Sequence, residues 1–400
     1  MENVYIIDSL RSPVGKYGGA LSSVRPDDMA ALVIDKLMEK SSLEGHHIND
    51  VIVGCANQAG EDNRNIARMA ALLAGLPETV PGVTVNRLCA SSLEAIIQGA
   101  RAIKSGEVDI IIAGGVESMS RAPYSIPKNV SGAAMFGNLT AYDTALGWRY
   151  PNKEMEKMFP LESMGETAEN VAERWGISRE EQDSFAFASH QKAATARDNG
   201  VLAEEITPVP VAAKKGEFHF VEYDETIRPD TSIEKLAKLS PAFRKGGSVT
   251  AGNSSSLNDG AAMVLMASES AVKRHNLTPI ARYISSAAVG VDPRFMGIGP
   301  VYAIRSLLSK TGMSIEDIGL FEINEAFAAQ ALACQKELSI SNEQLNINGG
   351  AIAIGHPLGM SGARISGSLI RSMQRHNHQF GIASLCIGVG QGLAVLYERV

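Results

Sequence analysis

The sequence predicts an α/β fold built from two similar halves with an inserted segment between them. Three observations support this prediction: strand and helix patterns alternate over the first 120 residues, the alternation stops between residues 121 and 248, and it resumes near residue 281. The 400 residues exceed a single hydrophobic core. We therefore expect an N-terminal half over 1–120 that is completed by 249–275, an inserted loop domain over 121–248, and a C-terminal half over 276–400.

The first 120 residues follow the rhythm of repeated βαβ units. Short apolar runs predict strands, and longer amphipathic stretches predict helices. The predicted strands are 4–8, 50–54, 82–86 and 109–114, and the predicted helices are 27–40, 65–74 and 91–105. Such units form a sheet with helices on both faces.

The inserted segment is rich in proline. Half of the sixteen prolines fall between residues 121 and 248, together with two helical stretches near 166–175 and 179–198. Because proline interrupts regular strand and helix patterns, we interpret this segment as a lid or loop domain, where substrate-contacting residues often lie.

The C-terminal half repeats the N-terminal half in outline. Leu345–Asn348 resembles Val83–Asn86, and each predicted strand is followed by a sharp turn, a helix and a later strand, at 109–115 and at 380–386. A pseudo-twofold pair of such units brings the two strand ends together at the centre. Ligands of open α/β sheets bind outside the carboxyl ends of strands, so we expect one shared active site.

Cys89 stands where the predicted strand 82–86 turns into the predicted helix 91–105. A thiol at this place lies near the positive end of the helix dipole, which stabilises a thiolate and lowers the thiol pKa. The alternative is a small buried apolar residue, which is common for a free cysteine. The other motifs favour a nucleophile.

His356 lies in a glycine-rich run from Gly349 to Gly362, just before another predicted helix. Glycines let the backbone approach a ligand closely, and an imidazole can take a thiol proton near neutral pH. A structural or phosphate-binding loop is the alternative. The near-Rossmann glycine spacing lacks the acidic residue that would bind a ribose.

Two more motifs stand at predicted strand ends. Cys386 is followed by three alternating glycines that include Gly388, whose exposed N–H groups can donate to an oxyanion. Asn324 lies where a strand runs into a helix, at the predicted N-cap. A buried cysteine before a tight turn and a simple helix cap are the alternatives.

Two thiols, one imidazole and one amide at such turns point to a narrow chemistry. One thiolate attacks a carbonyl and holds the acyl group, the histidine activates it, and the second thiol exchanges a proton at carbon. Hydrolysis does not need the second thiol. Cleavage of a 3-oxoacyl thioester does, because the carbanion or enolate that leaves must be protonated.

The motifs NRLCASS, TAGNSSS, NEAFA, GGAIAIGHPLGMSGAR and CIGVGQG together resemble those of thiolases over essentially the whole chain. The resemblance implies the thiolase fold, in which two βαβαβ-type halves form a layered α-β-α-β-α core. It also implies acyl-CoA as substrate, coenzyme A as co-substrate, no metal and no tightly bound cofactor. A homodimer or homotetramer is expected.

The resemblance implies a role for each matched residue. Cys89 corresponds to the acylated nucleophile, His356 to the base that activates it, and Cys386 to the acid/base thiol. Asn324 corresponds to the residue that holds a water of one oxyanion hole, and the N–H groups of Cys89 and Gly388 form the other. The residues matched to the coenzyme A channel are Arg228, Ser255 and Met296.

Several runs, among them 54–68 and 142–149, most closely resemble 3-oxoadipyl-CoA thiolases of aromatic-compound degradation, whose substrate ends in a carboxylate. A cation is needed for that carboxylate, and we favour Arg149 because aromatic residues flank it. A solvated loop residue or an inter-subunit salt bridge is the alternative. Met164 and Phe327 are further candidate substrate-binding residues.

Other activities remain as alternatives. A general 3-ketoacyl-CoA thiolase of fatty-acid β-oxidation is the nearest, followed by an acetoacetyl-CoA thiolase. Ser163 argues against the latter, because short-chain biosynthetic thiolases have histidine there. Cys386 argues against a decarboxylating condensing enzyme of the same superfamily. An inactive thiolase-like binding scaffold is the alternative from a different class, and it need not keep the nucleophile.

Composition excludes several kinds of partner. The net charge is −7 and the basic residues are interspersed with acidic ones, so nucleic acid is not expected. The four cysteines show no CxxC spacing, and no apolar run predicts a signal peptide or membrane span. We expect a reduced, cytoplasmic protein. His46 and His47 lack further ligands at metal-site spacing, so we expect a solvated loop there.

Overall fold

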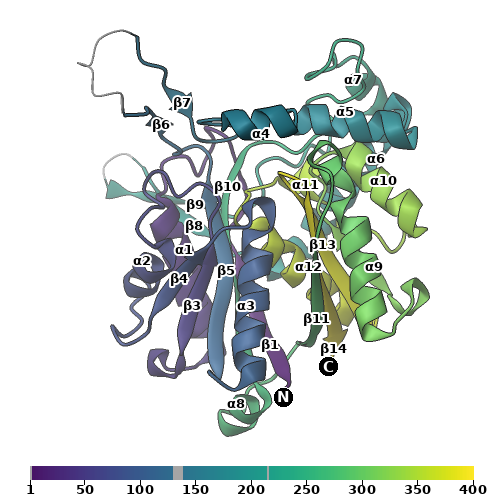
Figure 1. The fold of residues 1–400 in the computed structure, drawn as a ribbon. Coiled ribbons are helices and arrows are strands. Elements are labelled where there is room, and N and C mark those ends of the chain that lie inside the picture. Colours follow the sequence, from purple (N-terminus) through teal and green to yellow (C-terminus); the bar gives the residue numbers. More distant parts are fainter. Residues whose placement is uncertain (1, 129–137, 214–215) are drawn as a thin grey trace.

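A computed structural model describes residues 2–128, 138–213 and 216–400 (Figure 1). Its elements confirm the alternation predicted for the first 120 residues. The strands there are β1 (Val4–Arg11), β2 (Gly15–Lys16), β3 (Asp50–Gly54), β4 (Gly82–Val85) and β5 (Ile110–Ser118), and the helices are α1 (Pro26–Ser41), α2 (Ile66–Leu73) and α3 (Ser91–Ser105).

The segment between β5 and β10 contains short strands and several helices, and residues 129–137 and 214–215 within it lie outside the described residues. Figure 1 shows α4, α5 and α7 lying over one end of the sheet. The elements are β6 (Tyr124–Ser125), β7 (Tyr142–Asp143), α4 (Lys153–Met158), α5 (Met164–Trp175), α6 (Arg179–Asp198), β8 (Val209–Ala212), β9 (Phe218–Val221) and α7 (Ile233–Ala237).

The remainder of the chain completes the first half and forms the second. β10 (Asn258–Ser268) returns to the N-terminal half and is followed by α8 (Glu269–Arg274). The second half contains β11 (Ala281–Gly290), α9 (Gly299–Thr311), β12 (Leu320–Ile323), α10 (Ala328–Leu338), α11 (Ala351–Ile354), α12 (Ser361–His376), β13 (Phe380–Ile387) and β14 (Gln391–Arg399).

The main strands form one sheet in the order β12-β13-β14-β11-β1-β10-β5-β3-β4. The two halves join where β1 pairs antiparallel with β11 over Val4–Ile6. Each half has the same arrangement: a parallel pair, β3 with β5 or β12 with β13, is followed by antiparallel neighbours. The duplication predicted from the sequence is therefore confirmed.

The three largest apolar clusters define five layers, and two smaller clusters lie beside them. The helices α3 and α12 pack between the two half-sheets, α1 and α2 cover the outer face of the N-terminal half, and α9 and α10 cover the outer face of the C-terminal half. Along β5, Ile111 and Ala113 face the central helices, whereas Ile110 and Ile112 face α1 and α2. Within the described residues, no helix is both long and apolar enough to cross a membrane.

The predicted strand Leu345–Asn348 is not formed, which corrects one expectation. Only an isolated parallel bridge joins Leu345 to Phe321, in the place that corresponds to the pairing of β3 with β4. Asn346 has a positive φ of 45°. Its side chain accepts from the N–H of Ile323 at 2.9 Å and donates to the carbonyl of Ile323 at 2.9 Å. A side chain thus replaces the strand ladder.

Candidate active site

The turn that carries Cys89 is short and held by its own hydrogen bonds. Cys89 lies in a 3₁₀ turn, Leu88–Ala90, between β4 and α3. Leu88 adopts a left-handed backbone with φ of 48°, which a leucine rarely adopts. The N–H of Leu88 donates to Asn86 Oδ1 at 2.9 Å, and Ser91 Oγ donates to the carbonyl of Leu88 at 2.7 Å. The predicted strand-turn-helix placement of Cys89 is present.

The predicted low pKa of Cys89 is wrong for this structure. Burial raises the pKa of the Cys89 thiol to about 11, although the backbone N–H groups of Gly388 and of Cys89 itself act in the opposite direction. The loss of water around the sulfur outweighs the nearby donors. The resting group is therefore a neutral thiol.

His356 occupies the turn between α11 and α12 and is buried. Its Nδ1 lies 2.6 Å from Ser361 Oγ, and that hydroxyl donates its proton to the carbonyl of Pro357 at 2.8 Å. Ser361 must then accept from Nδ1–H, which leaves a lone pair on Nε2. Burial, with the charge of Arg364, lowers the pKa of His356 to about 3. The imidazole is neutral, with Nε2 as its basic atom.

The turns of Cys89 and His356 meet because α3 and α12 begin side by side. The N–H of Ala363 donates to Ser92 Oγ at 2.9 Å. A Cβ atom at Gly362 would lie 2.4 Å from the backbone nitrogen of Leu93, so a glycine is required at this crossing. The two halves thus bring nucleophile and base candidates to adjacent helix N-termini, as the duplication predicted.

Cys386 and Gly388 lie at the end of β13, next to the Cys89 turn. Cys386 is buried, and burial raises the pKa of its thiol well above its ordinary value, with a smaller contribution from Cys89. A Cβ atom at Gly388 would lie 3.4 Å from Leu88 Cδ1 and 3.5 Å from Met164 Sδ. The structure therefore brings both thiols and the Gly388 N–H into one site.

Asn324 lies in the same site but does not cap a helix, which corrects the predicted N-cap. The helix α10 begins at Ala328, and Phe327 holds the N-cap position with an extended backbone. The residues before it pair instead with the 253–255 segment, where the N–H of Ser255 donates to the Ala326 carbonyl at 3.0 Å. Asn324 Nδ2 lies 3.3 Å from His356 Nε2, and its buried Oδ1 has no partner among the described residues.

An apolar cluster adjoins Cys386. Met164 and Phe327, two candidate substrate residues, belong to it, and the ring of Phe243 lies 6.1 Å from that of Phe327. Met296, expected along the coenzyme A channel, is buried in the same cluster. The full cluster is Ala168, Val249, Met296, Ala326, Phe327 and Cys386, with Met164 packed against it.

The remaining predicted residues lie apart from this centre or at its edge. Ser255 Oγ donates to the carbonyl of Ala326 at 3.1 Å, which places it beside the apolar cluster. Arg228 is exposed. Arg149 is half-buried and donates to the carbonyl of Thr144 at 2.6 Å. Within the described residues, no hydrogen bond joins Arg149 or Arg228 to the catalytic candidates.

Sequence reasoning missed the residues that hold the His356 turn. Asn258 Oδ1 accepts from the N–H of His356 at 2.9 Å, and Asn258 Nδ2 donates to the Gly15 carbonyl at 2.9 Å. Ser361 could have been found from its place at the start of a helix, five residues after the histidine. Asn258 lies almost 100 positions away in sequence, and no local pattern points to it.

One buried group of three potential metal ligands is present among the described residues. Cys55 Sγ and carboxylate oxygens of Asp62 and Glu117 lie within 4.8 Å of one another. The carboxylates are already engaged: Asp62 accepts from the Gly60 N–H at 2.8 Å, and Glu117 accepts from three backbone N–H groups. We interpret the group as a hydrogen-bonded cluster.

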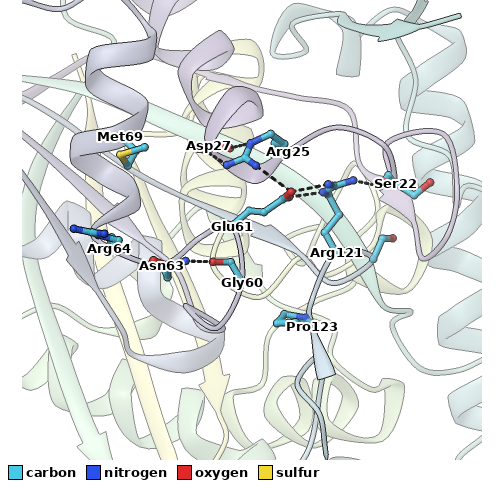
Figure 2. A pocket seen from close by; sticks show the side chains of 11 residues that line it. Ser22, Arg25, Asp27, Gly60, Glu61, Asn63, Arg64, Met69, Arg121 and Pro123 are labelled. Carbon is cyan, nitrogen blue, oxygen red and sulfur yellow. Dashed lines mark hydrogen bonds and ion pairs between the residues drawn. The ribbon is translucent and has the colours of Figure 1, made fainter. Parts of the chain in front are cut away.

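A large cavity lies away from the thiols, on the rim of the N-terminal half. It has a volume of about 890 Å³, and Figure 2 shows four of its charged side chains paired with one another: Arg25, Asp27, Glu61 and Arg121. Arg25 donates to Asp27 at 2.8 and 2.9 Å, and Arg121 Nη2 donates to Glu61 at 2.6 Å. This charge-paired cavity is not part of the thiol site.

Comparisons with known proteins match the whole chain. The family model described as "Thiolase, N-terminal domain" matches residues 4–270, and "Thiolase, C-terminal domain" matches residues 277–399. The chain is 52% identical to the 3-oxoadipyl-CoA/3-oxo-5,6-dehydrosuberyl-CoA thiolase of Escherichia coli (strain K12) and 52% identical to the beta-ketoadipyl-CoA thiolase of Pseudomonas putida, with 100% of both chains covered in each case. Its structure is similar to the crystal structure of the Bacillus anthracis acetyl-CoA acetyltransferase, with a TM-score of 0.94 and 42% sequence identity over 100% of this chain and 99% of that one.

Proposed function

The chain belongs to the thiolase family, and we propose that it cleaves 3-oxoadipyl-CoA with coenzyme A to succinyl-CoA and acetyl-CoA. The chemistry is supported by one observation above all: the half-buried thiol of Cys89 lies beside the buried thiol of Cys386 and within reach of the N–H of Gly388. The substrate is supported by full-length identity of 52% to relatives named for 3-oxoadipyl-CoA and beta-ketoadipyl-CoA.

The first half-reaction begins from a neutral pair. As Cys89 attacks the 3-oxo carbon, its proton passes to Nε2 of His356, whose orientation is set by Ser361. The bond between carbons 2 and 3 then breaks, and its electron pair leaves on carbon 2 as the enolate of acetyl-CoA. Cys386 protonates that carbon, which leaves a succinyl thioester on Cys89.

The second half-reaction returns the enzyme to its starting state. The thiol of coenzyme A passes its proton to the Cys386 thiolate and attacks the succinyl carbonyl. Protonated His356 returns its proton to Cys89, which leaves as the thiol, and succinyl-CoA is released. The oxyanion that develops on the Cys89-bound carbon accepts hydrogen bonds from the N–H groups of Cys89 and Gly388. Asn324 and His356 form the second oxyanion site, in which the unpartnered Oδ1 of Asn324 is suited to hold a water.

We also propose a homodimer, which can pair into a homotetramer, with β4 at the dimer interface. β4 lies at the edge of the described sheet, where it pairs with β3 alone, and α2 packs beside it. Apolar side chains are exposed on this surface: Met69 (42%), Leu72 (44%), Leu73 (52%) and Val83 (41%). Several exposed apolar side chains on an edge strand and its neighbouring helix are typical of an interface.

Two measurements test the proposed activity. Enzyme mixed with acetyl-CoA should gain one acetyl group by intact mass, and the adduct should be absent in Cys89→Ser. Cys386→Ala should still accept that acetyl group, yet it should cleave 3-oxoadipyl-CoA more slowly by a factor of roughly 10² to 10⁴, because only the carbon protonation is lost. An adduct confined to Cys386 would overturn the assignment of the nucleophile, and equal loss of both half-reactions in Cys386→Ala would show that this thiol serves the nucleophile instead.

Steady-state kinetics with three substrates test the acyl chain. We expect the highest kcat/KM for 3-oxoadipyl-CoA, compared with acetoacetyl-CoA and 3-oxohexanoyl-CoA. A preference for 3-oxohexanoyl-CoA would establish a general 3-ketoacyl-CoA thiolase instead. Failure to form any acyl-enzyme would establish the inactive scaffold.

A further inference from the structure

Glu117 is a buried carboxylate that accepts from three backbone N–H groups and, at 3.9 Å, from the Cys55 thiol. It lies in β5, is 1% exposed, and forms no ion pair within the described residues. Its carboxylate accepts from the N–H of Ala56 at 3.0 Å, of Asn57 at 3.1 Å and of Gly359 at 2.8 Å. Burial of a charge is costly unless donors surround it, so three converging donors indicate a specific function for this carboxylate.

The bond to Gly359 anchors the turn of the base. Gly359 lies three residues after His356 and two before Ser361, which orients the imidazole. The turn packs directly on the neighbouring backbone, because a Cβ atom at Gly359 would lie 2.3 Å from the Val116 carbonyl oxygen. Glu117, the next residue along β5, therefore fixes the height of the His356 turn over the sheet.

The bonds to Ala56 and Asn57 anchor the turn of the nucleophile through one further residue. Asn86 Nδ2 donates to the carbonyl of Ala56 at 3.0 Å, and Asn86 Oδ1 accepts from the N–H of Leu88 at 2.9 Å. Leu88 immediately precedes Cys89. The path from Glu117 to the Cys89 turn thus runs through Ala56 and Asn86, whereas Glu117 binds the His356 turn directly at Gly359.

We propose that Glu117 is a positioning residue that clamps the Cys89 turn and the His356 turn together through three backbone hydrogen bonds to one ionised carboxylate. The inference rests on the proposed thiolase chemistry but not on the identity of the acyl chain. The three bonds explain why a glutamate is present here. A glutamine would place an NH₂ group where one of the two carboxylate oxygens accepts from a backbone N–H, so it could not accept all three bonds.

Protonation should loosen this clamp. Burial raises the pKa of Glu117 to about 7, with nearby Asp62 acting in the same direction and the three N–H groups opposing it. The titratable groups that face it are Cys55 and Asp62 from the loop after β3 and Cys89 from the 3₁₀ turn. A carboxyl group that gains a proton loses an acceptor, so acylation of Cys89 should slow as the pH falls through about 7.

The test is the rate at which acetyl-CoA acetylates Cys89, followed by rapid-quench mass measurement. Glu117→Gln should lower this rate by roughly ten- to a hundredfold at saturating acetyl-CoA, while the half-saturating concentration changes less than about threefold, because alignment is lost and binding is not. The fall in rate between pH 8 and 6 should flatten in the variant. Glu205→Gln is the matched control, because Glu205 is also a buried carboxylate but pairs with Arg11. It should lower the melting temperature without changing the acetylation rate.

A double-mutant cycle keeps the test independent of the stability of Glu117→Gln. Asn86→Ala cuts the path between Ala56 and the nucleophile at an exposed residue. The fold-loss in acetylation rate of the double variant should be smaller than the product of the fold-losses of the two single variants, because both changes break the same path. An acetylation rate for Glu117→Gln within about threefold of the unsubstituted enzyme, or fully multiplicative effects, would overturn the clamp. Absence of 3-oxoadipyl-CoA cleavage with normal acetylation would contradict only the proposed substrate.

Discussion

At the scale of single residues, the resting active site pairs a neutral thiol with a neutral imidazole. Burial moves the two pKa values in opposite directions, to about 11 for Cys89 and about 3 for His356, because in each case the charged form loses water. The ion pair is therefore unfavourable before substrate binds. The proton transfer that creates the nucleophile must occur together with attack. At that moment the oxyanion donors stabilise the negative charge that develops on the substrate oxygen.

This neutral pair predicts the reactivity of the free enzyme. Alkylation of Cys89 by iodoacetamide should be slow at pH 7 and should accelerate about tenfold per pH unit up to about pH 10, since the thiolate is the reacting species. Peptide mass measurement should locate the label on Cys89, and Cys89→Ser should remove it. A rate that levels off below pH 8 would show that an ion pair exists at rest.

Arg149 remains our candidate for the distal carboxylate of the substrate. Its guanidinium uses Nη1 for the carbonyl of Thr144, and Trp148 beside it is anchored by a bond from its Nε1 to the Glu162 carbonyl at 3.1 Å. Arg149→Met should lower kcat/KM for 3-oxoadipyl-CoA by roughly ten- to a hundredfold, or about 1.4 to 2.7 kcal/mol. Activity on uncharged 3-oxohexanoyl-CoA should change little. Proportional loss on both substrates would assign Arg149 to the fold or to coenzyme binding.

At the scale of elements, α6 holds the segment that carries Arg228. His190 on α6 is buried, and its Nδ1 accepts from the N–H of Arg228 at 3.2 Å. Burial, with the charge of Arg228, lowers the pKa of His190 to about 4. The folded protein therefore keeps this histidine neutral over a range in which the unfolded chain binds a proton.

The consequence is a loss of stability in acid. Between pH 6.5 and 4 the unfolded chain binds one more proton than the folded protein at His190, so the free energy of unfolding falls by up to about 1.4 kcal/mol for each pH unit lost. The contribution is complete above pH 6.5. In His190→Gln, denaturant unfolding should depend less steeply on pH over this range, whereas the exposed control His219→Gln should behave like the unsubstituted protein. If the unfolding free energy of His190→Gln depended on pH as steeply as that of the unsubstituted protein, His190 would not cause the loss of stability in acid.

At the scale of the whole molecule, the duplicated halves explain why the site lies at the centre. Each half places one central helix, α3 or α12, and the first turns of these two helices meet where the N–H of Ala363 donates to Ser92 Oγ. Cys89 and His356 therefore lie in the turns that precede corresponding helices of the two halves. The inserted segment covers this end of the sheet with α5 (Figure 1). Met164, the first residue of α5, lies close to Gly388.

The exposed surface of α2 and β4 leads to a prediction about assembly. The double variant Met69→Glu with Leu73→Glu should shift the protein to monomers in sedimentation velocity, because two charges would have to be buried in an apolar interface. Tyr302→Glu, at another exposed apolar position, is the matched control and should leave the assembly unchanged. An unchanged oligomer in the double variant would place the interface elsewhere.

The sequence by itself determined the order of the elements, the duplication, and the motifs that carry Cys89, His356, Cys386 and Asn324. These features depend on local periodicity and on residues close together in the chain, so they can be predicted before folding is considered. The family resemblance followed from the same short motifs, and the family models match both halves.

Only the tertiary structure decided the direction of the Cys89 pKa, the start of α10 at Ala328 and the replacement of a strand by the Asn346 side chain. It also decided the partnership of Glu117 with Gly359, which are 242 positions apart. Each of these depends on desolvation or on hydrogen bonds between segments distant in the chain. Such contributions are set by which groups surround a residue after folding, and a local pattern does not contain that information.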